Sequence, residues 1–207
     1  MRTPGTLLRQ ASPLADPACQ VFCLESPDDE ELPRFDATLR RHGLAPLAAR
    51  RIDVLLFLHA DTHLPEGFSQ TVRATLADGC VAGAFRLRID GEHPGLRWVA
   101  WGANLRSRLL ALPYGDQALV LPARRFYDMG GFADLPWMED LEFVRRLRRT
   151  GRIAIAPTAV TTSARRWQSW GILRTTLIHQ ACLAGYLLGI PPRWLHRWRG
   201  GDGRPDR

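Results

Sequence analysis

The sequence predicts an α/β domain in which helices cover the faces of a mostly parallel sheet. From residue 52 onward, apolar segments of strand length alternate with segments of helical spacing, which is the pattern of this fold class. The run 52–58 is apolar without alternation, as expected of a strand buried on both faces. With 207 residues, 45% of them hydrophobic, the chain is large enough for one buried core and short for two.

The individual elements follow from periodicity and from breaks at glycine and proline. Pro65 and Gly67 mark the turn after the first buried strand, and Gly151 caps a charged helix. We expect strands at 19–24, 52–58, 81–89, 117–122, 153–156 and 160–163. We expect helices at 28–41, 68–76, 96–112, 123–129, 139–150 and 169–188. The resulting organisation is a divergent N-terminal segment over 1–50, a domain over 51–199 and a disordered tail over 200–207.

The charge is uneven along the chain. All 28 basic residues are arginine, which we interpret as a coding bias, and from residue 141 onward there are 13 arginines against three acidic residues. Such a basic region suits phosphate groups, an anionic membrane surface or nucleic acid. An arginine-rich nucleic-acid-binding domain is therefore an alternative, but the acidic motifs described below would oppose a polyanion, and we expect no nucleic-acid partner.

Neither the cysteines nor the apolar segments indicate a secreted or membrane-spanning protein. The four cysteines are scattered, and no signal peptide is apparent. The longest apolar stretch, 172–190, is interrupted by Arg174, His179 and Gln180, so it is a poor spanning helix. We expect a cytoplasmic location. Tryptophan mixed with arginine after residue 164 leaves peripheral contact with the inner face of the membrane as an alternative to a packed helix with a basic outer face.

Two acidic positions are candidates for chemistry. Asp61 follows the buried strand 52–58, at the strand end where open α/β sheets bind ligands. A carboxylate there suits Mg²⁺ or Mn²⁺ bridging a diphosphate, although Asp also commonly caps a turn. Glu139 and Asp140 begin a helix, where the helix dipole alone favours them. They also follow apolar residues including Trp137, so Asp140 is a candidate general base beside a sugar-binding wall.

Four motifs occur in order along the chain. They are Leu-Leu-Phe-Leu-His-Ala-Asp-Thr at 55–62, Tyr-Gly-Asp-Gln at 114–117, Gly-Gly-Phe at 130–132 with Met-Glu-Asp at 138–140, and Thr-Ser-Ala-Arg-Arg-Trp at 162–167. Over about residues 50–199 the chain resembles the family 2 glycosyltransferases of the GT-A fold. It looks most similar to a small bacterial subfamily found beside radical-SAM or selenium-domain proteins.

The resemblance implies a role for each matching residue. Asp61 matches the last Asp of the family's DxD-like motif, which holds the metal and the donor diphosphate, and His59 replaces the first Asp. Asp140 matches the base of the ED motif, and Glu139 supports it. Two further groups follow in the same way. Arg166 and Trp167 match a donor-binding motif, and Asp116, Gln117 and Trp137 would line the acceptor side.

The implied activity is metal-dependent, inverting transfer of a sugar from a nucleotide-diphosphate sugar to an unidentified hydroxyl acceptor. Mg²⁺ or Mn²⁺ would be the cofactor. Relatives grip the nucleotide with two N-terminal segments that we do not find before residue 52. The alternative is therefore a non-catalytic or partner-dependent remnant that lacks donor binding.

Overall fold

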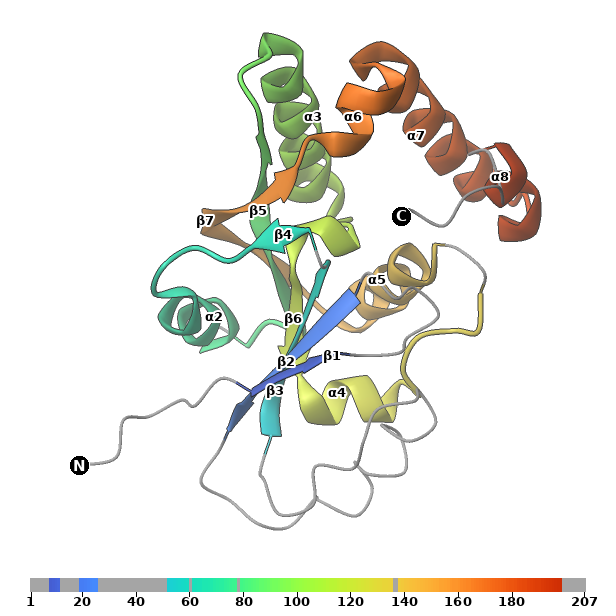
Figure 1. The fold of residues 1–207 in the computed structure, drawn as a ribbon. Helices are drawn as coiled ribbons and strands as arrows, with labels where there is room; N and C mark the ends of the chain where they lie inside the picture. The colour runs from blue at the N-terminus through green and yellow to red at the C-terminus, as the bar shows by residue number, and fades with distance from the viewer. Residues whose placement is uncertain are drawn as a thin grey trace.

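The computed structural model describes residues 8–11, 19–25, 52–59, 61–77, 79–135 and 138–198 (Figure 1). The helix expected at 28–41 and the tail at 200–207 lie outside these ranges. The strand expected at 19–24 is confirmed as β2 (Cys19–Glu25), and β1 (Leu8–Ala11) pairs with it. The fold is α/β, and the described strands form one seven-stranded sheet in the order β1-β2-β3-β6-β5-β7-β4.

The sheet is mixed, which corrects the expectation of a mostly parallel one. β3 (Ile52–His59) runs antiparallel to β6 (Leu119–Pro122), and β6 runs antiparallel to β5 (Ala82–Asp90). β5 is parallel to β7 (Ile153–Ser163), the one parallel pairing among the described strands. Consequently β3, β5 and β7 point the same way and β6 points the opposite way. β3 ends beside the start of β6, and β5 and β7 continue beyond that point.

The extent of the pairing between β6 and β5 is limited by α3 (Pro94–Leu110). The side-chain amide of Asn104 on α3 accepts from the backbone N–H of Leu87 at 2.7 Å and donates to its carbonyl at 2.9 Å. This side chain therefore takes the place of a neighbouring strand along the second half of β5. β6 pairs only with the first half, where Gly83 lies opposite Val120, and runs away from the site edge.

Helices cover both faces of the sheet. α2 (Phe68–Ala77) packs on one face, and α4 (Ala123–Asp128) and α5 (Glu139–Thr150) pack on the other. Alternate residues of β3 enter the two cores, with Leu55 and Phe57 on the α5 side and Leu56 and Leu58 on the α2 side. All four are at most 3% exposed, which confirms the expectation of a strand buried on both faces.

The C-terminal elements differ from expectation in two places. β7 is one strand rather than two, because the register shift opposite residues 84–86 accommodates Pro157 within it. The helix expected at 169–188 is broken at Gly171, whose φ of +83° ends α6 (Arg165–Trp170) before α7 (Ile172–Leu187) begins. The chain then enters α8 (Pro192–Trp198). None of the described helices has the length and apolar character needed to cross a bilayer.

Candidate functional site

The candidate site lies where β3 ends and β6 begins, with the short 3-10 helix Gly115–Gln117 at its centre. The backbone N–H of Gly115 donates to Oδ2 of Asp140 at 2.7 Å. A Cβ atom at Gly115 would lie 2.8 Å from Nε2 of His59 and 3.1 Å from Oδ2 of Asp140. The fold therefore brings His59 and Asp140, which are far apart in the sequence, together beside one glycine.

Asp140 is held by the start of α5. Met138 adopts a left-handed conformation with φ of +64° immediately before the helix, and Glu139 and Asp140 form its first turn, where the helix dipole favours carboxylates. Oδ1 of Asp140 accepts from the backbone N–H of Leu141 at 2.7 Å. Because a carboxylate oxygen has two lone pairs, Asp140 keeps acceptor capacity beyond these two backbone bonds.

Asp116, beside Gly115, has an unusual electrostatic environment. Its Oδ1 atom is shielded from solvent and has no hydrogen-bond partner among the described residues. Burial raises the pKa of Asp116 above its usual value, and the charges of His59, Arg106 and Arg166 oppose this rise, while the charge of Asp140 adds to it. These five side chains therefore share one electrostatic environment around the 3-10 helix.

Arg106 and Tyr114 form the wall beside this carboxylate. The guanidinium of Arg106 lies 3.6 Å from the ring centroid of Tyr114, and its Nε donates to the carbonyl of Leu112 at 3.1 Å. Nη2 of Arg106 is buried without a hydrogen-bond partner in the described part of the chain. Burial raises the pKa of Tyr114 to about 12, against the opposing charge of Arg106.

Sequence reasoning did not identify Arg106 as a site residue. Arg97 and Arg108 occur in the same helix and are exposed, so no local pattern distinguishes the one arginine that faces inward. Tyr114 lies in the Tyr-Gly-Asp-Gln motif, and the resemblance implies no role for its side chain.

Gln117 makes several hydrogen bonds within the chain, and its expected contact with the acceptor stays a prediction. Its side chain is fully buried, and its Oε1 accepts from Oγ of Ser107 at 2.6 Å and from the backbone N–H of Tyr114 at 3.3 Å. Its Nε2 donates to the carbonyl of Phe85 at 3.1 Å. The amide therefore joins α3, β5 and the segment of the 3-10 helix by hydrogen bonds, and it holds the 3-10 helix in place.

Asp61 lies just beyond β3 and is tied to the end of β7. β4 (Thr62–His63) pairs antiparallel with β7, and the carbonyl of Asp61 accepts from the backbone N–H of Ser163 at 3.1 Å. Thr62 donates through Oγ1 to Oγ1 of Thr162 at 3.1 Å, and Thr162 donates in turn to Oδ1 of Asp61 at 3.4 Å. This hydroxyl chain orients the carboxylate, which is half-buried rather than enclosed.

The donor-motif residues of α6 separate in the structure. Arg166 is exposed, yet its charge acts on Asp116, so it belongs to the surroundings of the site. Trp167 is only 8% exposed and packs among Leu87, Ile89 and Leu96. This packing anchors α6, and the expected contact of Trp167 with the donor stays a prediction. Trp137, expected on the acceptor side, lies outside the described residues.

Two further observations bear on ligands. Within the described ranges, no group of three or more His, Cys, Asp or Glu side chains is placed to hold a metal ion. A groove of about 620 Å³ lies elsewhere, between α2 and the first half of β7, and none of the candidate residues lines it. The convergence around Gly115 therefore rests on the contacts given above rather than on a preformed cavity.

Comparison with known proteins adds no relative to these observations. No protein-family model, no curated protein and no solved structure matches the chain.

Proposed function

We propose that this chain is a metal-dependent, inverting glycosyltransferase that moves a sugar from a nucleotide-diphosphate sugar to a hydroxyl acceptor. The convergence of His59, Asp116 and Asp140 around Gly115 carries the proposal, because these residues come from three of the motifs that resemble family 2 enzymes. The common direction of β3, β5 and β7, with Asp61 at their carboxyl edge, supports a GT-A-like arrangement.

The donor side of the proposed site is Asp61, with His59 as the second ligand. Mg²⁺ commonly uses one or two protein carboxylates and completes its shell with substrate phosphates and water. The half-buried carboxylate of Asp61 would hold a Mg²⁺ or Mn²⁺ ion jointly with a diphosphate. Such an ion supplies positive charge to the departing nucleoside diphosphate.

The acceptor side is Asp140. In an inverting displacement the acceptor hydroxyl attacks the anomeric carbon while the bond to the diphosphate breaks, and the hydroxyl proton must leave. The carboxylate of Asp140 takes that proton, since the bonds from Gly115 and Leu141 fix its orientation and leave lone pairs available. Arg106 and Arg166 place positive charge beside the same space.

The test combines calorimetric titration with UDP and an assay of UDP release from UDP-sugars. Wild-type protein should bind UDP only with Mn²⁺, and Asp61→Ala should abolish that binding. Asp140→Asn should keep the binding and reduce sugar transfer by about 10²–10⁴-fold, because the amide cannot accept the proton. Asp128→Ala, an exposed carboxylate on α4, is the matched control and should behave as wild type.

Two outcomes would contradict the proposal. A folded wild-type chain that binds no nucleoside diphosphate, with or without Mn²⁺, would favour the partner-dependent remnant. Metal-dependent binding together with wild-type transfer by Asp140→Asn would remove Asp140 from the role of base and leave the donor site intact.

A further inference from the structure

Exposed large hydrophobic side chains gather in one part of the described structure. All of them lie on α3, α6 and α8, or on α7 and its C-terminal cap: Trp98, Trp101, Leu105, Leu109, Leu110, Trp170, Leu173, Leu177, Leu187, Leu188 and Trp194. Scattered single residues of this kind are normal on a protein surface, whereas a concentration on adjacent helices indicates a binding surface. Figure 1 shows α3 beside α6 and α7 at one end of the molecule.

On α3 these side chains form a continuous stripe. Trp98, Trp101, Leu105 and Leu109 recur at helical spacing and are between 39% and 73% exposed. The buried residues of the same helix, Leu96, Ala100 and Ser107, lie on the opposite face. The rings of Trp98 and Trp101 meet edge-on, with centroids 5.8 Å apart. The stripe therefore faces outward and contributes little to the core.

α7 also exposes large apolar side chains to solvent. Leu173 and Leu177 are 73% and 58% exposed, whereas Thr175 and Cys182 on the other side of the helix are buried. Its first residue, Ile172, joins the core cluster of α3, and a Cβ atom at Gly95 would lie 3.2 Å from Cδ1 of Ile172. The two helices therefore start next to each other, and each presents apolar residues outward.

The charge on these helices is of one sign. α3, α6, α7 and α8 contain arginines and no Asp or Glu, and the whole segment 143–201 contains no acidic residue. Arg97 and Arg108 are exposed on α3 itself. A second copy of the chain would bring two arginine-rich faces together, which like charges disfavour. A surface that is both apolar and anionic complements the face better.

We propose that the outward face of α3, together with that of α7, docks on an anionic lipid surface. Tryptophan and leucine side chains would enter the boundary between headgroups and acyl chains, and the arginines would contact lipid phosphates while their aliphatic stems follow the apolar surface. The docking elements differ from the site residues, so this inference stands apart from the proposed sugar transfer. Docking would combine attraction of the arginines to lipid phosphates with burial of the tryptophan and leucine side chains.

Vesicle co-sedimentation of the full chain tests the proposal. The protein should bind vesicles containing about 30% phosphatidylglycerol in phosphatidylcholine more tightly than pure phosphatidylcholine. Binding should weaken when the salt rises from about 0.1 M to about 1 M, because the Debye length falls from about 10 Å to about 3 Å. Trp98→Gln/Trp101→Gln should bind about tenfold more weakly. These positions are exposed, so circular dichroism and thermal melting should remain those of wild type.

Charge variants separate docking from diffuse attraction. Arg97→Gln/Arg108→Gln should lower binding to anionic vesicles, whereas Arg73→Gln/Arg149→Gln, which removes two exposed arginines from α2 and α5, should not. Absence of binding to anionic vesicles, or equal losses in the two arginine pairs, would overturn the proposal. Self-association that Trp98→Gln/Trp101→Gln abolishes, without vesicle binding, would assign the face to a second copy.

Discussion

Asp116 and Arg106 are both half-buried, and each has one solvent-shielded side-chain atom that lacks a hydrogen bond. Oδ1 of Asp116 and Nη2 of Arg106 have no partner among the described residues, and such atoms cost free energy unless something satisfies them. Burial raises the pKa of Asp116, and the positive charge of Arg106 opposes that rise. A polar, charged substrate could form hydrogen bonds with an unsatisfied acceptor and an unsatisfied donor of this kind. Their presence near Asp140 supports placing the substrate in this space.

Tyr114 offers a direct test of the desolvation around these groups. Its pKa rises from the ordinary 10.0 to about 12, mainly through burial. The folded protein therefore retains this proton after the unfolded chain has lost it. The stabilising contribution is complete below pH 10.0 and is lost as the pH rises through about 12.

We expect one of the three tyrosines to ionise about two pH units above the ordinary tyrosine pKa of 10.0. Tyr114→Phe should remove that late ionisation step. Between these pH values wild type should lose about 2–3 kcal/mol of unfolding free energy relative to the variant. Spectrophotometric titration and urea unfolding at several pH values measure both effects. A late step that persists in Tyr114→Phe would place the effect on another tyrosine.

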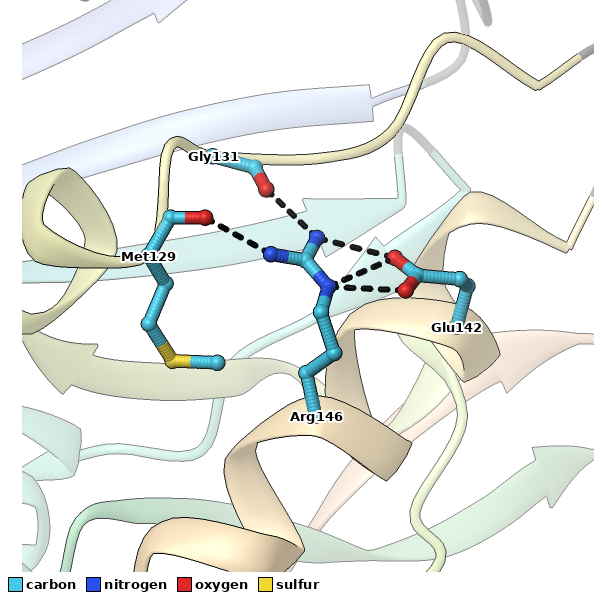
Figure 2. A network of polar contacts seen from close by, with 4 residues as sticks. All are labelled: Met129, Gly131, Glu142 and Arg146. Carbon is cyan, nitrogen blue, oxygen red and sulfur yellow. Dashed lines mark hydrogen bonds and ion pairs between the residues drawn. The ribbon is translucent and has the colours of Figure 1, made fainter.

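At the scale of elements, the position of Asp140 depends on how α5 is attached to the turn before it. Figure 2 shows Arg146 on α5 joined to Glu142, Met129 and Gly131. Its Nε donates to Oε1 of Glu142 at 2.7 Å, and Nη1 and Nη2 donate to the carbonyls of Met129 and Gly131, each at 2.7 Å. In the described structure, the turn that contains the Gly-Gly-Phe motif is therefore attached to α5 through hydrogen bonds from Arg146.

Phe132 completes the same attachment from the apolar side. The centroid of its ring lies 4.9 Å from the ring centroid of Phe57 on β3 and 5.0 Å from that of Phe143 on α5. One aromatic side chain thus contacts the strand that leads to Asp61 and the helix that carries Asp140. Aromatic contacts of this kind stabilise by about 0.5–1.5 kcal/mol beyond simple burial.

Arg146→Lys should loosen this attachment, because a lysine ammonium cannot present the planar fork that reaches both carbonyls and the carboxylate. We expect a loss of about 1–3 kcal/mol in unfolding free energy, measured by urea denaturation. Arg149→Lys, an exposed position on the same helix, is the control and should change stability by less than about 0.5 kcal/mol. Equal effects of the two substitutions would show that the bonds to the turn contribute nothing.

At the scale of the whole molecule, local patterns predicted the elements and missed their directions. The strand at 52–58 and the helices at 68–76 and 139–150 are confirmed, because burial in or against the sheet determines the apolar pattern of each segment. The extent of the pairing between β6 and β5 depends on Asn104, which occupies the edge of β5 at Leu87, a contact across 17 residues that no local pattern contains. The inward position of Arg106 and the hydrogen bonds of Gln117 depend on similar long-range packing, so the sequence could not predict them.

The proposed site joins elements from across the sheet, so a ligand there should stabilise the whole fold. Asp61 connects to β7 through Thr162, and Asp140 connects α5 to Gly115. UDP with Mn²⁺ at about a hundred times its dissociation constant should add about 2.7 kcal/mol to the stability of the folded state. For a chain of this length that corresponds to a rise in Tm of about 5–10 °C.

Thermal melting of three proteins measures this linkage. Wild type and Asp140→Asn should show the rise equally, since Asp140 acts on the acceptor, whereas Asp61→Ala should show none. Polyphosphate with Mn²⁺ serves as the control for simple attraction to the basic C-terminal region, which carries 13 arginines. If polyphosphate stabilised Asp61→Ala as strongly as UDP stabilised wild type, the chain would be acting as a polyanion binder, and the acidic motifs would have only structural roles.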